Sequence, residues 1–509
     1  MPSAQPGRAS ARASARLVLG PTALAVIGLT AAAGALRFAT LDVQSYWYNE
    51  AATVVLAKLG FADMLAEIPR MEGNPPLYYV LGWAWSRVFG TGEVGLRSLS
   101  ALAGTAMVPA VYAAGARLAG RRTGVSIAAL AAFAPLLVWF SQEARPYILL
   151  ALLTSLALVF FLRVLERGRA RDVGLWAALS MLALATHYFA LFAIAPQGAW
   201  LLWRCRRRTP VVIGLGAIAA LAAALLPLAL DQQEPAKTSI PGALGTRAVQ
   251  LPKQLLVGFN SVAERPLAVV AAALVALGAW LAWRRGATRV RRAAALTGGL
   301  GAAAVALVLA GALVGVDYLN TRNMIEAWLP LLMAPAIGFA APGAGKLGVG
   351  ALATLCVIGL VAVLSVDLDR AYQRDDWRGA VRALGRADGA RAILVTPANG
   401  VLPLRVYLPR ARPLPDPVGA RVSEIDLLGV APRGGEGQTP APPRPAAFYF
   451  PPPFRQVDVV RDPTFTVARA RAGAPVAVTL GSLGPSQLPA PGGTVTLLEP
   501  GAGQGPDEP

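Results

Sequence analysis

The 509-residue sequence is short of charge, of cysteine and of histidine. Only 15% of its residues are charged, whereas soluble domains carry about a quarter, and 55% are hydrophobic, which indicates a membrane protein. Cys205 lies beside a basic cluster and Cys356 lies in an apolar run, so the two cysteines support neither a disulfide framework nor a zinc site. His187 is the one histidine in the chain.

The formal net charge of +19 raises the possibility of a nucleic-acid partner. The basic residues do not form one patch, however, but short clusters between apolar runs, as expected for cytoplasmic loops of a membrane protein. A lipid bilayer is therefore the expected partner, and nucleic acid is not. The clusters are Arg117/Arg121/Arg122, Arg163/Arg167/Arg169/Arg171, Arg204/Arg206/Arg207/Arg208 and Arg284/Arg285/Arg289/Arg291/Arg292.

The apolar runs predict a mostly α, polytopic membrane protein of the plasma membrane, with about 11 transmembrane helices in residues 17–365. A cleaved signal peptide is the alternative for the first run, but its length of about 30 Å favours an uncleaved span after a cytoplasmic tail, 1–16. The expected spans are 17–38, 98–118, 123–141, 146–164, 173–187, 188–203, 210–230, 266–284, 293–315, 324–341 and 347–365.

The segment 74–89 decides the topology, because counting it as a span would place every later arginine cluster outside. Its helical part, from Leu77, is only about 20 Å long, and its tyrosines and tryptophans suit the membrane interface. We therefore expect a juxtamembrane helix at 75–89 inside one long external loop, 40–97.

The character of the sequence changes near residue 366. A helical pattern at 375–386 followed by a strand pattern at 391–396 predicts an extracytoplasmic α/β domain over 366–509. The Pro/Gly-rich stretch 430–455 is expected to be irregular, and the last dozen residues disordered.

Polar residues gather at the outer ends of the expected spans, where a charged group is costly and is usually kept for a partner or for function. Glu143 and Arg145, in "FSQEARPY", suit a metal ligand or acid/base group and a phosphate clamp, with an ordinary solvated turn as the alternative. His187 suits a metal, a phosphate or a sugar, or a structural hydrogen bond. Arg322 suits a phosphate diester, or an interfacial anchor.

Several motifs follow one another in an order that resembles the GT-C glycosyltransferases of the protein-mannosyltransferase and aminoarabinose-transferase type. They are "YWYNEAATVVLA" (46–57), "GNPPLYYVLGWAW" (73–85), "GTGEVGLRSLSALAG" (90–104), "SQEARPY", "THYF" and "YQRDDWRGA". The resemblance implies transfer of a sugar, with inversion, from a polyprenyl-phosphate-linked donor on the outer face to a glycan, lipid or protein acceptor.

The resemblance also implies an Asp-Glu pair in the first external loop, whose Asp is the catalytic base, and the matching residues here are Asn49 and Glu50. Asn cannot accept a proton at neutral pH, so we expect Glu50 to be the base. Three alternatives remain: Asp42 supplies the base, Asn49 orients a hydroxyl of the acceptor, or the protein has lost transferase activity. The predicted catalytic residues are Glu50, Asn49 and Glu143.

The predicted substrate-binding residues are Asp42, Asn74, Tyr78, Arg97, Arg145, His187, Tyr188, Lys253 and Arg322. No cofactor is identified; a divalent metal ion held by Glu50, Glu143 and His187 is one hypothesis. Two other functions remain open, a transporter or flippase and a non-catalytic binder of a polyprenyl-linked glycan. The sequence shows no internal repeats or mid-membrane charges of the kind typical of transporters.

Overall fold

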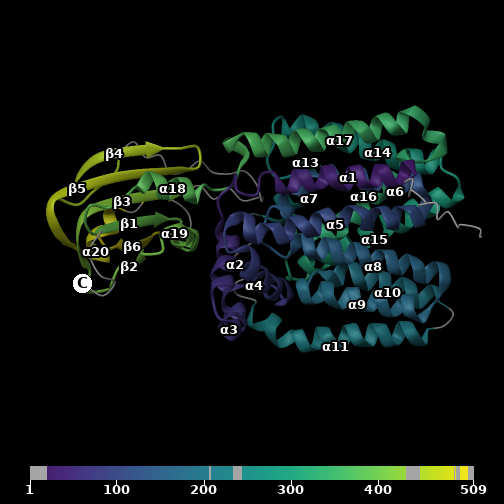
Figure 1. Cartoon of the computed structure of the whole chain (residues 1–509), viewed down its shortest axis with the longest axis horizontal. Helices are drawn as coiled ribbons and strands as arrows, with labels where there is room; N and C mark the ends of the chain where they lie inside the picture. Colours follow the sequence, from purple (N-terminus) through teal and green to yellow (C-terminus); the bar gives the residue numbers. More distant parts are fainter. Residues whose placement is uncertain are drawn as a thin grey trace, which may run out of the picture.

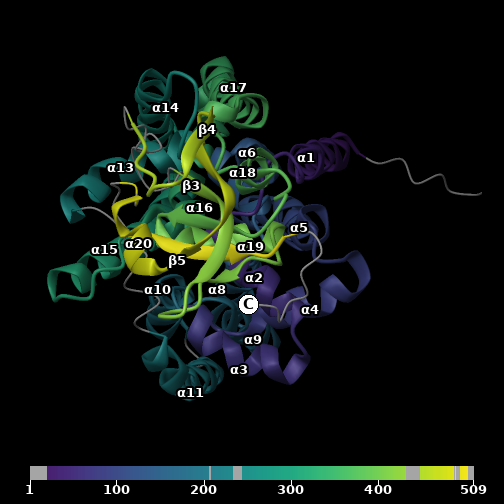
Figure 2. The same ribbon diagram turned by 90° about the vertical axis from the view of Figure 1, so that its left-hand side faces the viewer.

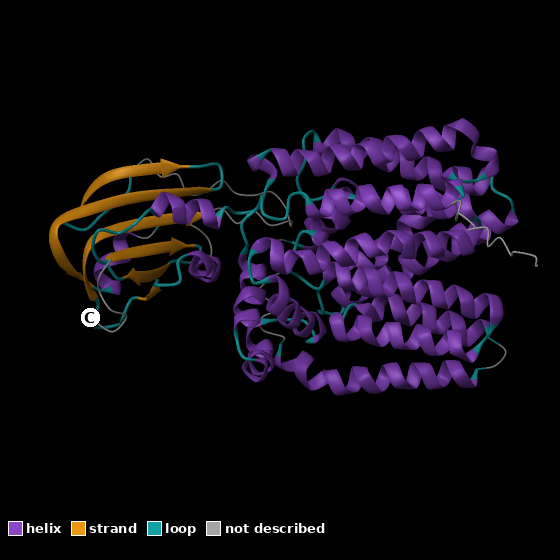
Figure 3. Cartoon of the chain, in the orientation of Figure 1, coloured by secondary structure: helices purple, strands orange, loops and turns teal. Residues whose placement is uncertain are grey.

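The computed structural model describes residues 20–205, 208–232, 243–430, 447–486, 488 and 493–501. A long bundle of roughly parallel helices carries a smaller sheet domain at one end (Figure 1). All the strands lie in the smaller part, which also contains short helices, whereas the bundle is helical (Figure 3). The expected tail 1–16 and most of the stretch 430–455 lie outside the described residues.

The bundle contains a helix, or a bent pair, at each of the eleven expected spans. These are α1 (Pro21–Phe38), α5 (Glu93–Ala119), α6 (Arg121–Phe133) with α7 (Pro135–Ser141), α8 (Tyr147–Arg167), α9 (Ala170–Thr186), α10 (Ala190–Arg204), α11 (Thr209–Asp231), α14 (Glu264–Arg284), α15 (Thr288–Leu313), α16 (Ile325–Phe339) and α17 (Gly345–Leu368). Helix α13 (Leu244–Val257) lies between α11 and α14.

Among the described residues, seven helices are long and apolar enough to cross a membrane, or eight if α6 and α7 form one span. Helices α9, α10 and α16 have 17, 15 and 15 residues, shorter than the approximately 20 that a straight span needs. The bundle is thus that of a multi-pass membrane protein, and the count of eleven spans stays a prediction.

The basic connections meet at the end of the bundle away from the sheet domain. Arg289 donates to the carbonyl oxygens of Leu118 (3.2 Å) and Arg117 (3.1 Å), and Arg117 pairs with Glu166 at 2.8 Å. Arg285 donates to Gly343 in the same way. These contacts bring the described arginines of the connections after α5 and α14 to one end, beside the last turn of α8. The positive-inside pattern requires such a grouping, although the orientation itself stays a prediction.

A proline bends the helix pair α6 and α7 by 58° just before the polar stretch 141–146. Pro135 has no N–H to donate, so carbonyl groups one turn earlier lose their helical partner. The fully buried Arg37 of α1 donates to the carbonyls of Ala131 (3.0 Å) and Ala132 (3.1 Å), and to Ser141 Oγ at 3.0 Å. The bend is thus stabilised by a side chain, and it fixes the start of the loop that follows.

Three short helices form the first long loop at the sheet end of the bundle (Figures 1 and 2): α2 (Tyr48–Lys58), α3 (Phe61–Met71) and α4 (Leu77–Phe89). Helix α4 begins directly after Pro75-Pro76 and ends at Gly90, whose φ of 78° suits glycine. Val88 and Phe89 are exposed at its end, which fits the predicted contact with lipid.

The C-terminal part is a six-stranded mixed sheet in the order β2-β6-β1-β3-β5-β4. The strands are β1 (Arg391–Thr396), β2 (Arg412–Pro413), β3 (Ala420–Val430), β4 (Arg455–Arg461), β5 (Phe465–Val478) and β6 (Val495–Glu499). The wholly buried β1 is central, parallel to β3 and antiparallel to β6. Helices α18 (Trp377–Leu384) and α19 (Val401–Tyr407) contribute to one apolar core, and α20 (Leu480–Leu483) to another. The predicted helix and strand both occur, and the helix is shorter than expected.

Candidate active site

The cluster of polar residues lies between the sheet end of the bundle and the sheet domain. Glu50, in the first turn of α2, has no exposed surface and faces Arg97 of α5. Arg97 donates from Nε to Oε1 at 2.7 Å and from Nη2 to Oε2 at 2.6 Å. The backbone N–H of Ala144 donates to Oε1 at 2.9 Å, so both carboxylate oxygens are occupied.

Arg97 also ties this carboxylate to the backbone of the preceding loop. Its Nη1 donates to the carbonyls of Leu41 and Gln44, both at 2.7 Å, and its Nη2 donates to Ser45 at 3.0 Å. Burial by itself raises the pKa of Glu50, but the charge and hydrogen bonds of Arg97 outweigh it and the pKa lies below the usual value. With a low pKa and a donor on each oxygen, Glu50 is a weak base in this arrangement.

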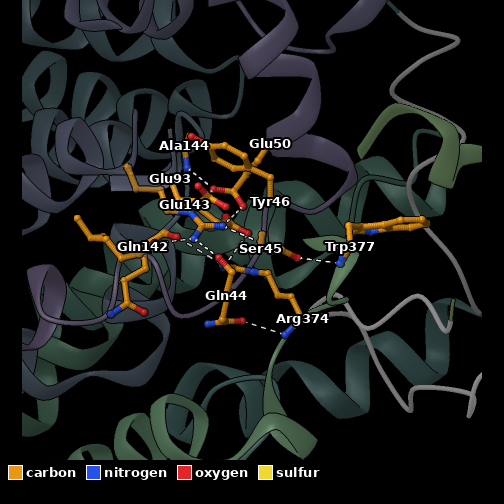
Figure 4. Close-up of polar contacts among 12 residues, drawn as sticks. Gln44, Ser45, Tyr46, Glu50, Glu93, Gln142, Glu143, Ala144, Arg374 and Trp377 are labelled. Carbon is orange, nitrogen blue, oxygen red and sulfur yellow. Dashed lines mark hydrogen bonds and ion pairs between the residues drawn. The ribbon is translucent and has the colours of Figure 1, made fainter. Parts of the chain in front are cut away.

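Glu143, in the loop between α7 and α8, is in the opposite situation. Its Oε1 lies 3.0 Å from Nη2 of Arg374, whereas Oε2 is buried and has no hydrogen-bond partner among the described residues. Figure 4 shows Glu143, Gln142 and Arg374 in one group of polar contacts with Glu50 and Ala144. Burial raises the pKa of Glu143 to about 6, although Arg374, Arg145 and Arg322 act in the opposite direction. A carboxylate with one free oxygen and such a pKa is suited to accept a proton near neutral pH.

Arg145 joins the loop that contains Glu143 to two parts of the first long loop. Its Nη1 donates to the backbone oxygen of Asn49 at 3.0 Å and to the carboxylate of Glu72 at 2.5 Å. Its guanidinium also lies 5.9 Å from the ring centre of Tyr79. The side chain of Asn49 is half-buried, and it is the backbone oxygen of this residue that Arg145 contacts.

His187 and Arg322 approach the site from two other connections. His187 caps the end of α9, its Nδ1 accepts the N–H of Phe189 at 3.2 Å, and its ring packs against Tyr147. Burial, with the nearby charges of Arg145 and Arg322, lowers the pKa of His187 to about 3, so the ring is neutral. Arg322 is 9% exposed in the 3-10 turn η1 (Thr321–Met324) before α16.

Two further predicted residues lie together beside this group, linked by Gln232. Tyr188 donates to Gln232 Oε1 at 2.7 Å, and Gln232 Nε2 donates to the carbonyl of Asn74 at 3.1 Å. Tyr78 is buried, and its hydroxyl is hydrogen-bonded to Oγ of Ser100 at 2.8 Å. It therefore belongs to the contact between α4 and α5.

Asp42 and Lys253 are not brought into the cluster by any described contact of their side chains. Asp42 is exposed, and it is its backbone oxygen that accepts from Arg378 at 2.7 Å. Lys253 pairs with Glu264 at 2.9 Å and donates to the carbonyl of Phe259. The alternative in which Asp42 supplies the base therefore gains no support from its position.

Two residues of the cluster, Glu72 and Arg374, are absent from the residues predicted by sequence. Glu72 directly precedes the "GNPP" motif, and this position beside a motif of the family resemblance is the sequence signal that could have identified it as a site residue. Arg374 lies in "YQRDDWRGA", which contributes to the family resemblance and which the sequence pattern assigns to the C-terminal domain. Its proximity to Gln142, 232 positions earlier, follows only from the tertiary structure.

The donor set does not fit the hypothesis of a metal held by Glu50, Glu143 and His187. Across the described ranges no group of three or more His, Cys, Asp or Glu side chains is arranged to hold a metal ion. The oxygens of Glu50 face Arg97, Oε1 of Glu143 faces Arg374, and Nδ1 of His187 accepts a backbone N–H. Several guanidinium groups would oppose a divalent cation here.

Comparison with known proteins gives matches of two kinds. Residues 73–229 match the family of dolichyl-phosphate-mannose-protein mannosyltransferases. A search of curated proteins gives no match. Among solved structures, ArnT from Cupriavidus metallidurans bound to undecaprenyl phosphate has a TM-score of 0.53 at 14% identity, over 87% of this chain and 97% of its own.

Two more distant structures have lower TM-scores. The apo oligosaccharyltransferase of Archaeoglobus fulgidus has a TM-score of 0.42 at 10% identity, over 72% of this chain and 58% of its own. The Pmt1-Pmt2 protein O-mannosyltransferase of S. cerevisiae bound to its sugar donor has a TM-score of 0.32 at 14% identity, over 46% of this chain and 36% of its own. The similarity to ArnT establishes the fold.

Proposed function

The chain has the GT-C fold of polytopic membrane glycosyltransferases, and we propose that it is an inverting glycosyltransferase using a polyprenyl-phosphate-linked sugar. The undecaprenyl phosphate bound to ArnT supports a lipid-linked donor. The observation that carries the proposal is Glu143: a buried carboxylate with one unpartnered oxygen, set among arginines at the sheet end of the bundle.

We assign the role of general base to Glu143 rather than to Glu50. The acceptor hydroxyl transfers its proton to Oε2 of Glu143 while its oxygen forms the new bond to the anomeric carbon. The bond between that carbon and the phosphate oxygen breaks, and polyprenyl phosphate leaves with the bonding electron pair. Attack opposite the leaving group accounts for the inversion that the resemblance implies.

The cations of the cluster suit the other half of this reaction. Charge develops on the phosphate as the sugar leaves, and preorganised guanidinium groups in a buried site stabilise it. Arg145 and Arg322 are assigned this role because the positive charge of each acts on Glu143 and on His187. His187, being neutral, can donate a hydrogen bond from Nε2 to the sugar or the phosphate.

Asn49 and Glu50 receive structural roles in this proposal. Glu50 fixes Arg97, which in turn holds the backbone of residues 41–45. Asn49 presents its backbone oxygen to Arg145 and thereby helps to aim the guanidinium. The missing acid at position 49 is then compatible with catalysis, because the base comes from a different loop.

The proposed orientation places the N-terminus and the arginine clusters in the cytoplasm and the sheet domain outside. The donor phosphate then meets the site at the outer membrane surface, where α4 exposes Val88 and Phe89. The acceptor is a glycan, a lipid or a protein, and no step depends on a metal ion.

The test is transfer of a labelled sugar from polyprenyl-phosphate donors to a panel of acceptors by the purified protein in nanodiscs. Glu143→Gln should lower kcat by about 100-fold or more, as loss of a general base does. Glu166→Gln is the matched control, an acid-to-amide change at the other end of the bundle, and should leave kcat unchanged. Undiminished transfer by Glu143→Gln would remove this residue as the base.

A non-catalytic binder of a lipid-linked glycan is the second candidate, and Asn49 favours it because an amide stands where the resemblance implies the base. The same assay separates the two functions. A binder would retain labelled donor in the wild type and in Glu143→Gln without forming product.

A further inference from the structure

The connection between α17 and α18, residues 369–376, supplies a side chain to the site from outside the bundle. Arg374 is fully buried, with its side chain 1% exposed. Its Nη2 lies 3.0 Å from Oε1 of Glu143, and its guanidinium carbon lies 4.0 Å from the ring centre of Trp139. Its Nη1 also donates to the carbonyl of Gln142 at 3.4 Å. All of these partners belong to α7 and the loop after it.

The backbone of this connection is fixed to the loop that precedes α2. The N–H of Arg374 donates to Oε1 of Gln44 at 2.9 Å. Ser45 donates from Oγ to the carbonyl of Asp375 at 2.7 Å and accepts the N–H of Trp377 at 2.9 Å (Figure 4). Position 374 is therefore held from both sides, and its side chain has little freedom to leave Glu143.

The sheet domain is attached to the same loop at a second point. Tyr407 of α19 accepts the N–H of Tyr46 at 2.6 Å and donates to Glu93 at 2.7 Å. Arg378 of α18 donates to the carbonyls of Asp42 (2.7 Å) and Val43 (3.2 Å). Residues 42–46 and the sheet domain thus form one hydrogen-bonded unit directly before Glu50.

We infer that Arg374 is a positioning residue for Glu143, and that the docked sheet domain completes the active site by holding Arg374 in place. The inference rests on the proposed function, because it gives Arg374 the task of orienting the proposed base. By binding Oε1, Arg374 leaves Oε2 as the oxygen that faces the acceptor. Arg374 touches neither substrate in this arrangement, so it acts on the rate through Glu143.

The first test compares Arg374→Gln, Arg374→Lys and Arg382→Gln in the full-length protein in nanodiscs. Arg382 is the matched control, because it is an exposed arginine on α18 with no contact to Glu143. Arg374→Gln should lower kcat by about 100-fold with the donor KM within about 2-fold, the pattern of an interaction needed in the transition state. Arg374→Lys keeps the charge without the planar fork and should lose only about 10-fold.

The same set of variants remains informative if one of them misfolds, and it includes results that would overturn the inference. If Arg374→Gln does not yield folded protein, Arg374→Lys decides, and a kcat within about 2-fold of the wild type overturns the inference. A folded Arg374→Gln protein with the kcat of Arg382→Gln overturns it as well, while Glu143→Gln still tests the base. A loss that appears as a raised donor KM, with kcat unchanged, would instead make Arg374 a donor-binding residue.

The position of Arg374 against residues 142–145 can also be tested without measuring turnover. This test stays valid even if the proposed function is wrong. Hydrogen exchange at the amides of residues 142–145 should be faster in Arg374→Gln than in the wild type or Arg382→Gln. Equal exchange in all three proteins would show that Arg374 does not hold this loop.

Discussion

Arg97 donates two parallel hydrogen bonds, of 2.7 and 2.6 Å, to the carboxylate of Glu50. The side chain of Arg97 is 1% exposed and that of Glu50 is 0% exposed. The contact is bidentate, and the other N–H groups of the Arg97 guanidinium donate to backbone carbonyls of the loop before α2. This geometry anchors the first loop, because one guanidinium holds both the carboxylate of Glu50 and the backbone of residues 41–45.

Arg97→Met should be strongly destabilising. Removing one member of a buried pair leaves the other charge uncompensated, which costs about 3–5 kcal/mol. Thermal unfolding in detergent measures the loss. Arg117→Met is the matched control: its pair with Glu166 is partly exposed, so the expected loss is below about 1 kcal/mol. Equal stabilities of the two variants would contradict the anchoring role.

The rate of sugar transfer should depend on the ionisation of Glu143. Its pKa is raised to about 6, and only the ionised form accepts a proton, so kcat/KM should be constant above pH 7 and fall about tenfold per unit below pH 6. His187 contributes nothing to this limb, since its pKa of about 3 keeps it neutral throughout. A pH-rate profile on the wild type tests this, and a flat profile between pH 5 and pH 8 would count against Glu143.

Arg145→Lys should weaken binding of the sugar donor. Lysine keeps the charge but cannot reach Glu72, Asn49 and a phosphate with one planar fork, so the donor KM should rise by about 10-fold. Arg163→Lys, at the opposite end of the bundle, serves as the comparison. Steady-state kinetics over a range of donor concentrations measures the difference, and an unchanged KM would remove Arg145 from the phosphate site.

Glu326→Leu should stabilise the protein. Glu326 in the first turn of α16 is 2% exposed and lines a cavity with Thr154 and Gln197, and neither of its oxygens has a hydrogen-bond partner among the described residues. Replacing an unsatisfied buried polar group with an apolar one of similar size should gain about 1–3 kcal/mol. Thermal unfolding decides, and a loss of stability would show that the carboxyl group is bonded in the native protein.

The predicted orientation can be tested with single cysteines in a variant lacking Cys205 and Cys356. A cysteine at Arg87, a polar and exposed position on α4, should react with an impermeant maleimide added to intact cells. A cysteine at the exposed Arg121 should react only after permeabilisation. The reverse pattern would show that residues 74–89 span the membrane and that the arginine clusters lie outside.

The sequence alone determined the helical bundle and the change to an α/β domain near residue 366, and it predicted the end of the bundle where the chemistry is proposed. Apolar runs, arginine clusters and the strand 391–396 are local signals, and local signals survive in a single sequence. The same signals placed Glu143 and Arg145 at a polar break between two helices. The number of spans and their orientation stay predictions, the first because α9, α10 and α16 are short for a membrane.

The tertiary structure alone decided which carboxylate keeps an oxygen without a hydrogen-bond partner among the described residues. Glu50 and Glu143 look alike in sequence, each an acid beside a helix end, and they differ only in their partners. Arg97 and the N–H of Ala144 occupy both oxygens of Glu50, whereas Arg374 occupies one oxygen of Glu143. Charge interactions act through space, so an arginine after the last span can set the chemistry of an acid in an early loop.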